Sequence, residues 1–290
     1  MPELPEVETL RRELERALVG RVIKSVKIFW SKTVQPFTPT IFAKQLKNVR
    51  VTSIERTAKI LFLNLSNGKT LAIHLKMTGQ LVFQSQGSTL GDFKVEPLIA
   101  GGHPEDPKKY TRAVFEFNGR AKLYFNDLRK FGWLRLVSAK DKQIMTEKYG
   151  LEPLSPEFTL ANFTRALTRY PNRKLKLTLL DQTLIAGLGN IYADESCFAA
   201  GLRPRRRVKT LTDKEIKKLH RAIKQILKLA LAKGGTSSRN YVRSDGSPGD
   251  FFSYLKAYGR SGQPCRRCLT PIAKIKLAGR GAHFCKNCQR

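Results

Sequence analysis

The chain has 290 residues, of which 41% are hydrophobic and 27% charged, so it is long enough for two domains with buried cores and is not a disordered chain. Its 54 basic and 23 acidic residues give a formal net charge of +31, and the basic residues run through the whole sequence. This charge fits a partner that is a long polyanion, although charge alone does not separate a protein that binds nucleic acid from one that acts on it. No apolar run approaches the roughly 18 to 20 residues of a spanning helix, which argues against a membrane protein.

The chain opens with an amphipathic helix, which we expect to begin at Pro5 and to end at Gly20. Its apolar positions fall on one face: Val7, Leu10, Leu14, Ala17 and Leu18. Acidic side chains cluster at the start of this helix, where the helix dipole favours negative charge. A purely structural role is therefore one interpretation of Glu3, Glu6 and Glu8.

A catalytic interpretation comes from Pro2, because a small second residue normally allows Met1 to be removed. The proline would then offer a free secondary amine, and an α-amino group has a reference pKa of roughly 8, against about 10.4 for lysine. Such an amine can attack a sugar C1′ and form an iminium, with Glu3 and Glu6 nearby to carry protons. A general acid needs a raised pKa, so burial of the carboxyl would have to outweigh the dipole.

Short strands are predicted between residues 21 and 137, at a spacing typical of a sandwich or barrel. The strand-like runs are Val22–Phe29, Val49–Glu55, Ile60–Leu65, Thr70–Leu75, Ala113–Phe117, Ala121–Asn126 and Trp133–Val137. The pairs Asn67-Gly68 and Asn118-Gly119 each separate two such runs and predict type I′ hairpin turns. The stretch from Gln84 to Lys109 is rich in Gly, Pro and Ser and predicts a long loop.

Helices are predicted after a domain boundary near residue 150, where Pro153 and Pro156 mark a linker. The clearest helix is 213–233, with a capping box at Thr212 and Glu215 and a stop at Gly234. The sequence therefore orders strands first and helices second.

Two cysteine pairs close the chain, Cys265-x2-Cys268 and Cys285-x2-Cys288, with sixteen residues between them. Four thiolates at this spacing can enclose one zinc ion in a structural site that leaves no open position for water. The alternative is two disulfides in a secreted protein, but no apolar signal segment opens the sequence. We read the fifth cysteine, Cys197, as ordinary core.

Three motifs occur in order along the chain: the opening Pro2–Thr9, the segment Leu188–Glu195 (LGNIYADE) and the four cysteines with Arg280 between the pairs. Together they resemble bacterial formamidopyrimidine-DNA glycosylases, which remove oxidised purines from DNA and then nick the strand. The resemblance runs the length of the chain. It implies an α+β multidomain fold with an N-terminal β-sandwich and flanking helices in 1–137, a linker in 138–152, a helix-two-turns-helix domain in 153–257 and a zinc finger in 258–290.

The resemblance also implies catalytic roles. Pro2 would be the nucleophile, Glu3 the acid that helps to open the deoxyribose and Glu6 a further acidic helper. Lys59, just before a strand-like run, would contact a phosphate near the lesion. Without the resemblance, a lysine at that place reads as a solvated strand end.

Further residues are implied as DNA contacts. The segment His74–Gly79 resembles the family's intercalation loop, in which Met77 would fill the gap left by the extruded nucleotide. Arg129 would face the orphaned base opposite the lesion, and Phe131 would wedge beside it. These assignments rest on the family, because a methionine or phenylalanine near strands is ordinarily core.

Phosphate contacts are expected from Asn190, in a turn ahead of a helix, and from Arg280 in the finger. A capping role is the alternative for Asn190. The segment from Ser237 to Phe252 corresponds to the family's mobile loop over the extruded base, and Ser247 stands where a lysine is frequent.

The sequence thus predicts a bifunctional glycosylase and lyase that binds one structural zinc ion and damaged duplex DNA, as a monomer in the cytoplasm at the nucleoid. An endonuclease VIII type that prefers oxidised pyrimidines shares this mechanism, although Leu4 and Val7 favour the purine branch. A silent binder of damaged DNA would follow if Met1 were retained. A ribosomal or transcription-type zinc ribbon would leave the opening acids and the Asn190 motif unexplained.

Overall fold

The structure is a computed structural model, and it describes residues 1–85, 109–238 and 240–290. Two compact units are present: unit 1 combines Met1–Thr146 with Lys233–Phe252, and unit 2 combines Glu147–Ala232 with Ser253–Arg290. Because packing alone defines these units, the domain limits expected from the sequence stay predictions. The loop expected between Gln84 and Lys109 lies, except for its ends, outside the described residues.

Unit 1 is built on an antiparallel sheet of eight strands in the order β5-β7-β6-β1-β2-β3-β4-β8. The strands are β1 (Val22–Ile28), β2 (Val49–Thr57), β3 (Ile60–Leu65), β4 (Thr70–His74), β5 (Gly79–Gln84), β6 (Thr111–Phe117), β7 (Lys122–Asp127) and β8 (Trp133–Val137). Its helices are α1 (Leu4–Leu18), α2 (Pro39–Leu46), α3 (Ala139–Thr146) and the 3₁₀ helices η1 (Ser31–Val34) and η3 (Asn118–Arg120).

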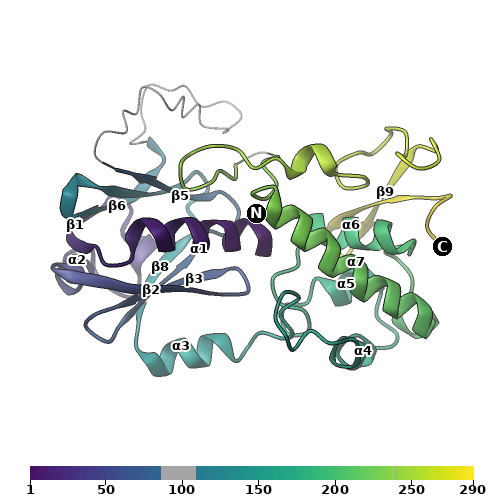
Figure 1. Cartoon of the computed structure of the whole chain (residues 1–290), viewed down its shortest axis with the longest axis horizontal. Helices are drawn as coiled ribbons and strands as arrows, with labels where there is room; N and C mark the ends of the chain where they lie inside the picture. Colours follow the sequence, from purple (N-terminus) through teal and green to yellow (C-terminus); the bar gives the residue numbers. More distant parts are fainter. Residues whose placement is uncertain (86–108, 239) are drawn as a thin grey trace. The chain divides into compact units, whose positions relative to one another are not determined.

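The sheet bends into a two-layered sandwich where β1 meets β2, because these two strands pair only at Val22–Arg50 and Ile23–Val49 (Figure 1). One hydrophobic core fills the space between the layers and joins residues such as Leu10 of α1, Leu63 of β3 and Leu123 of β7. Fully burying one such leucine contributes about 1.5–3 kcal/mol. The predicted β-sandwich is confirmed.

Helix α1 has the predicted apolar face, with Val7, Leu10, Leu14 and Leu18 all buried. It contacts β2, β3 and β5, so it packs against strands of both layers. The core thereby fixes the start of the chain, as the helical periodicity predicted.

Both predicted hairpins are present, since β3 pairs with β4 and β6 with β7, but their turns are not type I′. Asn67 and Asn118 keep negative φ, and positive φ falls on Gly68 (+75°) in one turn and on Gly119 (+71°) and Arg120 (+55°) in the other. These connections are longer than two residues, so the left-handed conformation comes late in each turn.

Sequence patterns missed four elements of unit 1: the 3₁₀ helix η1, the helices α2 and α3, and the strand β5. Helix α2 did carry a signal, because Thr38 accepts a hydrogen bond from Ile41 N (3.3 Å) and Pro39 is the first helical residue. Strand β5 begins at Gly79, the last residue of the His74–Gly79 segment, and pairs with β7 along its whole length. Helix α3 buries no residue and leaves no apolar pattern to read.

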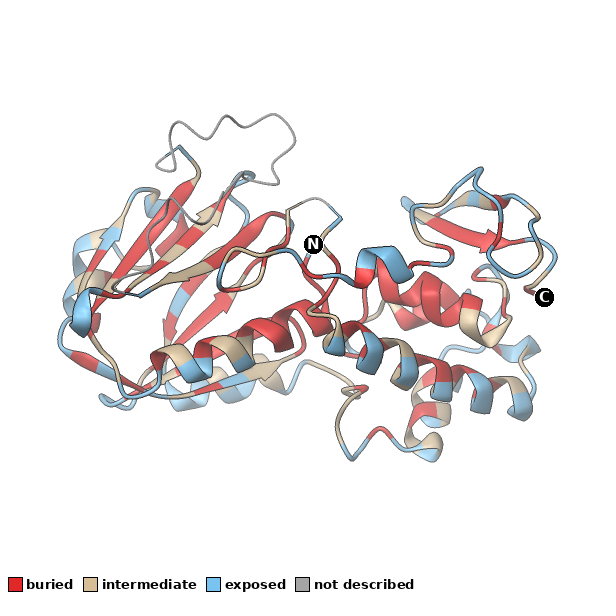
Figure 2. Cartoon of the chain, turned by 45° about the horizontal axis from the view of Figure 1, so that its top comes forward, coloured by how far each residue is buried: buried red, intermediate tan, exposed pale blue. Residues whose placement is uncertain are grey.

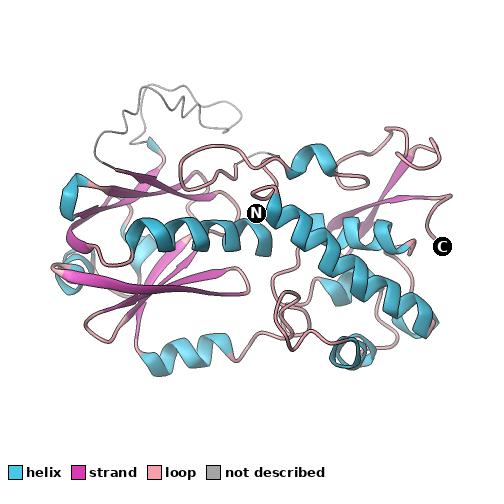
Figure 3. Ribbon diagram, in the orientation of Figure 1, coloured by secondary structure: helices cyan, strands magenta, loops and turns pink. Residues whose placement is uncertain are grey.

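Unit 2 is mainly helical, apart from one small hairpin (Figure 3). Its elements are α4 (Leu160–Thr168), α5 (Leu175–Leu179), α6 (Asn190–Ala200), η4 (Val208–Thr210), α7 (Asp213–Ala232), β9 (Ile272–Leu277) and β10 (Arg280–Cys285). The 3₁₀ helix η5 (Phe251–Tyr254) spans the division between the units.

The predicted helix at Thr212 is confirmed as α7. Thr212 Oγ1 accepts from Glu215 N (3.3 Å), Glu215 Oε2 accepts from Thr212 N (2.9 Å), and Gly234 takes a positive φ of +70°. One flank of the helix is buried and the other is exposed (Figure 2). Across the described residues, no helix has the length and apolarity that a membrane crossing requires.

Candidate functional site

The start of the chain is held inside unit 1. Met1 is 43% exposed, whereas Pro2 is buried and Glu3 is only 2% exposed. Glu3 is the extended residue that precedes α1. Removal of Met1 would therefore leave the Pro2 amine in a sheltered position next to a buried carboxyl.

Glu6 binds both the start of the chain and a segment that is distant in the sequence. Its Oε2 accepts from the backbone N of Glu3 (2.8 Å), and its Oε1 accepts from the backbone N of Thr236 (2.8 Å). Gly235 has φ +85°, and a Cβ there would lie 2.9 Å from Glu6 Cγ, so glycine alone fits the approach. Because both carboxylate oxygens accept backbone hydrogen bonds, the geometry gives Glu6 a structural task beside the predicted proton transfer.

The segment after Thr236 is fastened to unit 1 at several points. Glu13 accepts from Arg243 Nε (2.7 Å) and from the backbone N of Ser244 (2.9 Å). Burial and the neighbouring carboxylates of Glu6 and Glu13 raise the pKa of Tyr241 well above its usual range, so its phenol stays neutral. The described part of the predicted base-covering loop is thus anchored by the Arg243–Glu13 ion pair and by backbone hydrogen bonds.

Lys59 is 6% exposed and follows Ala58, whose φ of +52° is unusual for a residue with a side chain. Arg56 holds this turn, because it donates to Ala58 O (2.9 Å) and to Glu8 Oε2 (3.0 Å). Burial tends to raise the pKa of Glu8, but hydrogen bonds from Arg11, Arg56 and a third arginine outweigh it and hold the pKa below its usual value. Glu8 is therefore an anionic support for the arginine that shapes the Lys59 turn.

His74 is neutral in this environment. Burial, together with the positive charges of Lys76 and Lys59, lowers its pKa to about 3. Its Nδ1 accepts from the backbone N of Lys76 (2.9 Å), which leaves the proton on Nε2, and its ring packs against Trp133 at a centroid distance of 5.5 Å. A DNA contact by His74 would therefore be made by an uncharged ring.

The side chains predicted to enter the duplex are exposed, as a wedge must be. Met77 is 41% exposed and Phe131 52% exposed. The guanidinium carbon of Arg129 lies 4.7 Å from the Phe131 ring centroid, which keeps the two side chains together. A Cβ on Gly79 would lie 2.4 Å from Leu75 O, so the tight turn that presents Met77 needs glycine there.

One buried carboxylate connects the two loops. Asp127 Oδ1 accepts from the hydroxyl of Thr78 and from Arg129 N (3.2 Å), and its Oδ2 accepts from Gly132 N (2.7 Å). Thr78 Oγ1 in turn accepts from Arg129 N (3.0 Å). The Met77 loop and the Arg129–Phe131 loop are therefore supported by the same buried residue, which is 1% exposed.

In unit 2, Asn190 is the first residue of α6, and the preceding Gly189 is the cap. The capping interpretation of Asn190 is wrong, because its side chain makes no cap hydrogen bond. Its Oδ1 is buried and has no hydrogen-bond partner among the described residues. A buried amide oxygen without a partner at a helix N-terminus leaves this side chain available for an external ligand such as a phosphate, which the amide NH₂ would bind.

The two acids that end the LGNIYADE motif bind the finger region to α6. Asp194 Oδ1 accepts from Lys176 Nζ (2.6 Å), and its Oδ2 accepts from the backbone N of His283 (2.9 Å). Lys176 also donates to Gly281 O (2.6 Å). Glu195 accepts from three successive backbone N–H groups of residues 256–258, the shortest at 2.8 Å. These bonds hold the β9–β10 hairpin and the segment 256–258 in place.

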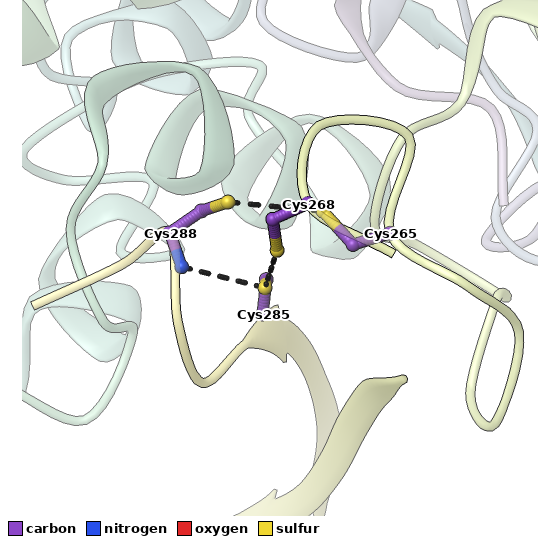
Figure 4. A group of neighbouring side chains, drawn as sticks. All are labelled: Cys265, Cys268, Cys285 and Cys288. Atoms are coloured by element: carbon purple, nitrogen blue, oxygen red, sulfur yellow. Dashed lines mark hydrogen bonds between the residues drawn. The ribbon is translucent and has the colours of Figure 1, made fainter. Parts of the chain in front are cut away.

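The four cysteines converge in unit 2 (Figure 4). Their sulfur atoms all lie within 4.8 Å of one another, with Sγ–Sγ distances of 3.9 Å for Cys265–Cys288 and 3.4 Å for Cys268–Cys285. Thiolates about 2.3 Å from a tetrahedral zinc ion stand about 3.8 Å apart, so the site fits zinc. The cysteines are free thiols, and the disulfide alternative is wrong.

Arg280 is exposed and opens β10, directly after a two-residue turn. Ala278 (φ +44°) and Gly279 (φ +78°) both have positive φ, which is the pattern of a type I′ turn. The turn type expected at the Asn-Gly pairs thus occurs here, where it presents Arg280.

The predicted site residues divide between the units. Unit 1 contains Pro2, Glu3, Glu6, Lys59, His74, Met77, Arg129 and Phe131; unit 2 contains Asn190, Arg280 and the four cysteines. Sequence reasoning missed the supporting residues Thr78, Asp127 and Lys176 because their partners are distant in the chain. Thr78 lies inside the His74–Gly79 segment and Asp127 just before Arg129, so polar residues at the motifs were a signal for these two; Lys176 lies outside the motifs. The functional roles of the site residues stay predictions.

Three family descriptions match successive parts of the chain: Formamidopyrimidine-DNA glycosylase N-terminal domain (residues 1–134), Formamidopyrimidine-DNA glycosylase H2TH domain (149–242) and Zinc finger found in FPG and IleRS (262–290). The formamidopyrimidine-DNA glycosylase of Herpetosiphon aurantiacus is 40% identical over 290 residues, which cover 100% of both chains. The chain belongs to the formamidopyrimidine-DNA glycosylase family. It is therefore a DNA glycosylase, with the sandwich, helical and zinc-finger architecture expected from the motifs.

Solved structures agree with this assignment. Lactococcus lactis Fpg in a complex with DNA that contains an abasic site has a TM-score of 0.85 and 34% identity, with 99% of each chain covered. MutM (FPG) from Thermus thermophilus has a TM-score of 0.83 and 36% identity, covering 99% of this chain and 98% of the other. The glycosylase holds one structural zinc ion in its four-cysteine site, which the finger family and the sulfur geometry both support.

Proposed function

We propose that this DNA glycosylase removes oxidised purines, such as 8-oxoguanine and formamidopyrimidines, from duplex DNA and then cleaves the strand by β,δ-elimination through an iminium at Pro2. The observation that carries the proposal is the sheltered position of Pro2 beside the buried Glu3. We also propose that the enzyme is a monomer and acts in the cytoplasm on the DNA of the nucleoid.

The reaction begins once Met1 is removed. Glu3 gives a proton to the sugar ring oxygen, the C1′–O4′ bond breaks and the ring opens, while the lone pair of the Pro2 nitrogen adds to C1′ of the damaged nucleotide. The glycosidic bond then breaks. The base leaves with its electron pair and takes up the N–H proton of Pro2, so that the nitrogen and C1′ form an iminium. The positive iminium then accepts the electrons released when a C2′ proton is removed, so the C3′–O bond breaks and, in a second elimination, the C5′–O bond follows.

Before this chemistry the nucleotide must leave the helix. Extrusion costs a few kcal/mol of stacking and pairing, and an apolar wedge offsets part of that cost. The exposed Met77 and Phe131 are suited to this task, and Arg129 to reading the orphaned base. Lys59, Asn190 and Arg280 bind phosphates, and the neutral His74 supports the turn that carries Met77.

The test is covalent trapping. The protein, first shown by intact mass to lack Met1 and to hold zinc, is incubated with duplexes that carry 8-oxoguanine, thymine glycol or an abasic site, and borohydride is added. We expect a reduced adduct that peptide mapping assigns to Pro2, strongest with 8-oxoguanine and the abasic site. An adduct at a lysine would contradict the assigned nucleophile, and no adduct would leave a binder without lyase chemistry.

The same panel decides the lesion class. Lactococcus lactis Fpg has also been solved with DNA that contains an oxidised pyrimidine, so pyrimidine lesions belong in the panel. Preferential excision of thymine glycol would move this protein to the endonuclease VIII type of activity.

A further inference from the structure

Helix α7 carries six basic side chains on the flank opposite its buried face. We call this set the α7 basic stripe: Lys214, Lys217, Lys218, Arg221, Lys224 and Lys228. Successive members are one to four residues apart, which places all six within about one third of the helix circumference at 3.6 residues per turn. Five are exposed and Lys224 is half-buried.

The positive charge of the stripe is not neutralised within the protein. No ion pair links any member to an acidic side chain among the described residues. The acidic residues of α7 are Asp213 and Glu215 in its first turn, and Glu215 is bound by Arg206 at 2.6 Å. Like charges four residues apart repel, as at Lys214–Lys218, Lys217–Arg221 and Lys224–Lys228. A solvated helix face usually mixes both signs, so a stripe of one sign weakens the helix unless an anion binds it.

The packing of α7 limits what that anion can be. Its apolar face is buried, and α4 and α6 pack against the helix, so it has no free apolar side to insert into a membrane. The stripe extends for about 21 Å along the axis, at 1.5 Å per residue. Duplex DNA carries one charge per about 1.7 Å of its axis, so a surface of this length can meet several phosphates at once.

We propose that the α7 basic stripe is a phosphate-binding surface for undamaged duplex DNA, separate from the Asn190 site. The stripe is exposed on the flank opposite the buried face of α7, and Asn190 begins α6, which packs against α7. This inference rests on the proposed function, because a DNA glycosylase that excises rare lesions must bind much undamaged DNA while it finds one. The contact is electrostatic and independent of sequence.

The experiment compares two triple variants of the full, zinc-loaded protein, each of which lowers the net charge by three. The stripe variant is Lys217→Gln/Lys224→Gln/Lys228→Gln. The matched control is Lys24→Gln/Lys44→Gln/Lys47→Gln, at exposed positions of unit 1. The dissociation constant for an undamaged duplex is measured against sodium chloride concentration.

For the stripe variant we expect the slope of log K against log salt to become shallower by about 0.9 for each phosphate that the protein no longer neutralises. The control variant should keep the wild-type slope, and the charge-conserving Lys217→Arg/Lys224→Arg/Lys228→Arg variant should restore it. At low salt the melting temperature of the stripe variant should be no lower than that of the wild type, because repulsion between the like charges of the stripe has been removed.

A stripe variant with the wild-type slope would overturn the proposal. Equal losses of duplex affinity in the two glutamine variants would also overturn the proposal, because the loss would then depend on the net charge of the protein and not on the stripe. Excision of 8-oxoguanine by the wild type is measured separately. Its absence would overturn the proposed function and leave the slope comparison valid.

Discussion

The hydroxyl of Thr78 donates a hydrogen bond to the buried carboxylate of Asp127, and this bond joins the loop that presents Met77 to the loop that presents Arg129 and Phe131. The first loop joins β4 to β5 and the second joins β7 to β8, and in neither case do the two joined strands pair with each other. The proposed Met77 wedge and the Arg129 side chain that would contact the opposite base have to enter the same gap in the duplex. Because Asp127 supports both loops, the positions of these two side chains are interdependent.

We expect Asp127→Asn to destabilise unit 1 by about 1–3 kcal/mol, because an amide nitrogen cannot accept from Gly132 N and a buried donor is left unpaired. Chemical unfolding measures this loss, with the exposed Asp213→Asn as a control that changes stability by less than about 0.5 kcal/mol. If the loops act together, the effects of Asp127→Asn and Met77→Ala on excision will be less than additive. Strict additivity would show that Asp127 supports only the fold.

Glu3→Gln should separate the two reactions. An amide cannot donate the proton that opens the sugar ring, so base excision should fall by about two to four orders of magnitude, the usual contribution of a general acid. An abasic site is already open to attack by Pro2, so nicking there should persist. Glu15→Gln, on the exposed side of the same helix, is the control. Equal loss of both activities would contradict this division of roles.

Pro2→Gly should retain part of the lyase activity, because glycine supplies a primary amine in place of the secondary one. The borohydride adduct should then map to Gly at position 2. Adduct formation at another residue in this variant would show that the terminal amine is not the nucleophile.

His74 should make stability depend on acid. Its pKa is about 3 in the folded protein and 6.5 in an unfolded chain. Below pH 6.5 the unfolded state therefore binds a proton on this imidazole that the folded state does not bind. The wild type therefore loses stability as pH falls from about 6.5 towards 3. His74→Asn, which cannot titrate, should show a smaller loss over this range when unfolding is followed at each pH. Parallel curves would mean that the imidazole is not held neutral.

Removal of zinc should unfold the finger but should not remove a group that takes part in the reaction. Chelation, or Cys268→Ser, takes away the metal that links the two knuckles, so duplex affinity should fall while unit 1 keeps its melting transition. Reloading with Co²⁺ or Cd²⁺ should restore binding and excision together. Rates that change with the Lewis acidity of the metal would contradict a structural role.

The Lys176–Asp194 pair is fully buried, and Asp194→Asn should cost about 3–5 kcal/mol because it leaves the Lys176 charge unpaired. Replacing both partners, as in Lys176→Met/Asp194→Leu, should cost less than Asp194→Asn alone. The partly exposed Arg173–Asp181 pair gives the control, where Asp181→Asn should cost at most about 1 kcal/mol. Equal losses of stability from Asp194→Asn and Asp181→Asn would show that burial does not determine the cost of breaking an ion pair.

Local patterns in the sequence predicted a large part of the fold. The face of α1, the capping box of α7 and seven of the sandwich strands follow from side-chain periodicity and from residues that stop a helix. The cysteine spacing identified the zinc site, because a CxxC knuckle brings its own two ligands together. Turn types were less predictable: a type I′ turn formed at Ala278-Gly279 and not at either Asn-Gly pair, since loop length and strand register decide the backbone conformation.

The candidate site was predicted as a set of residues, by motif, and not as a set of contacts. Glu6 was expected to carry protons, yet its two oxygens bind backbone N–H groups of Glu3 and Thr236. Asn190 was open to a capping role, and the structure instead leaves its Oδ1 unpaired among the residues described.

The sequence by itself determined the family, the zinc ligands, the basic character and the residues that can react, because each depends on the identity or spacing of neighbouring residues. Tertiary structure alone decided that Thr236 binds Glu6, that Thr78 binds Asp127 and that Asp194 holds the finger hairpin. These contacts join residues dozens to hundreds of positions apart. They form only after the hydrophobic cores close, when a buried carboxylate must find donors wherever the fold brings them.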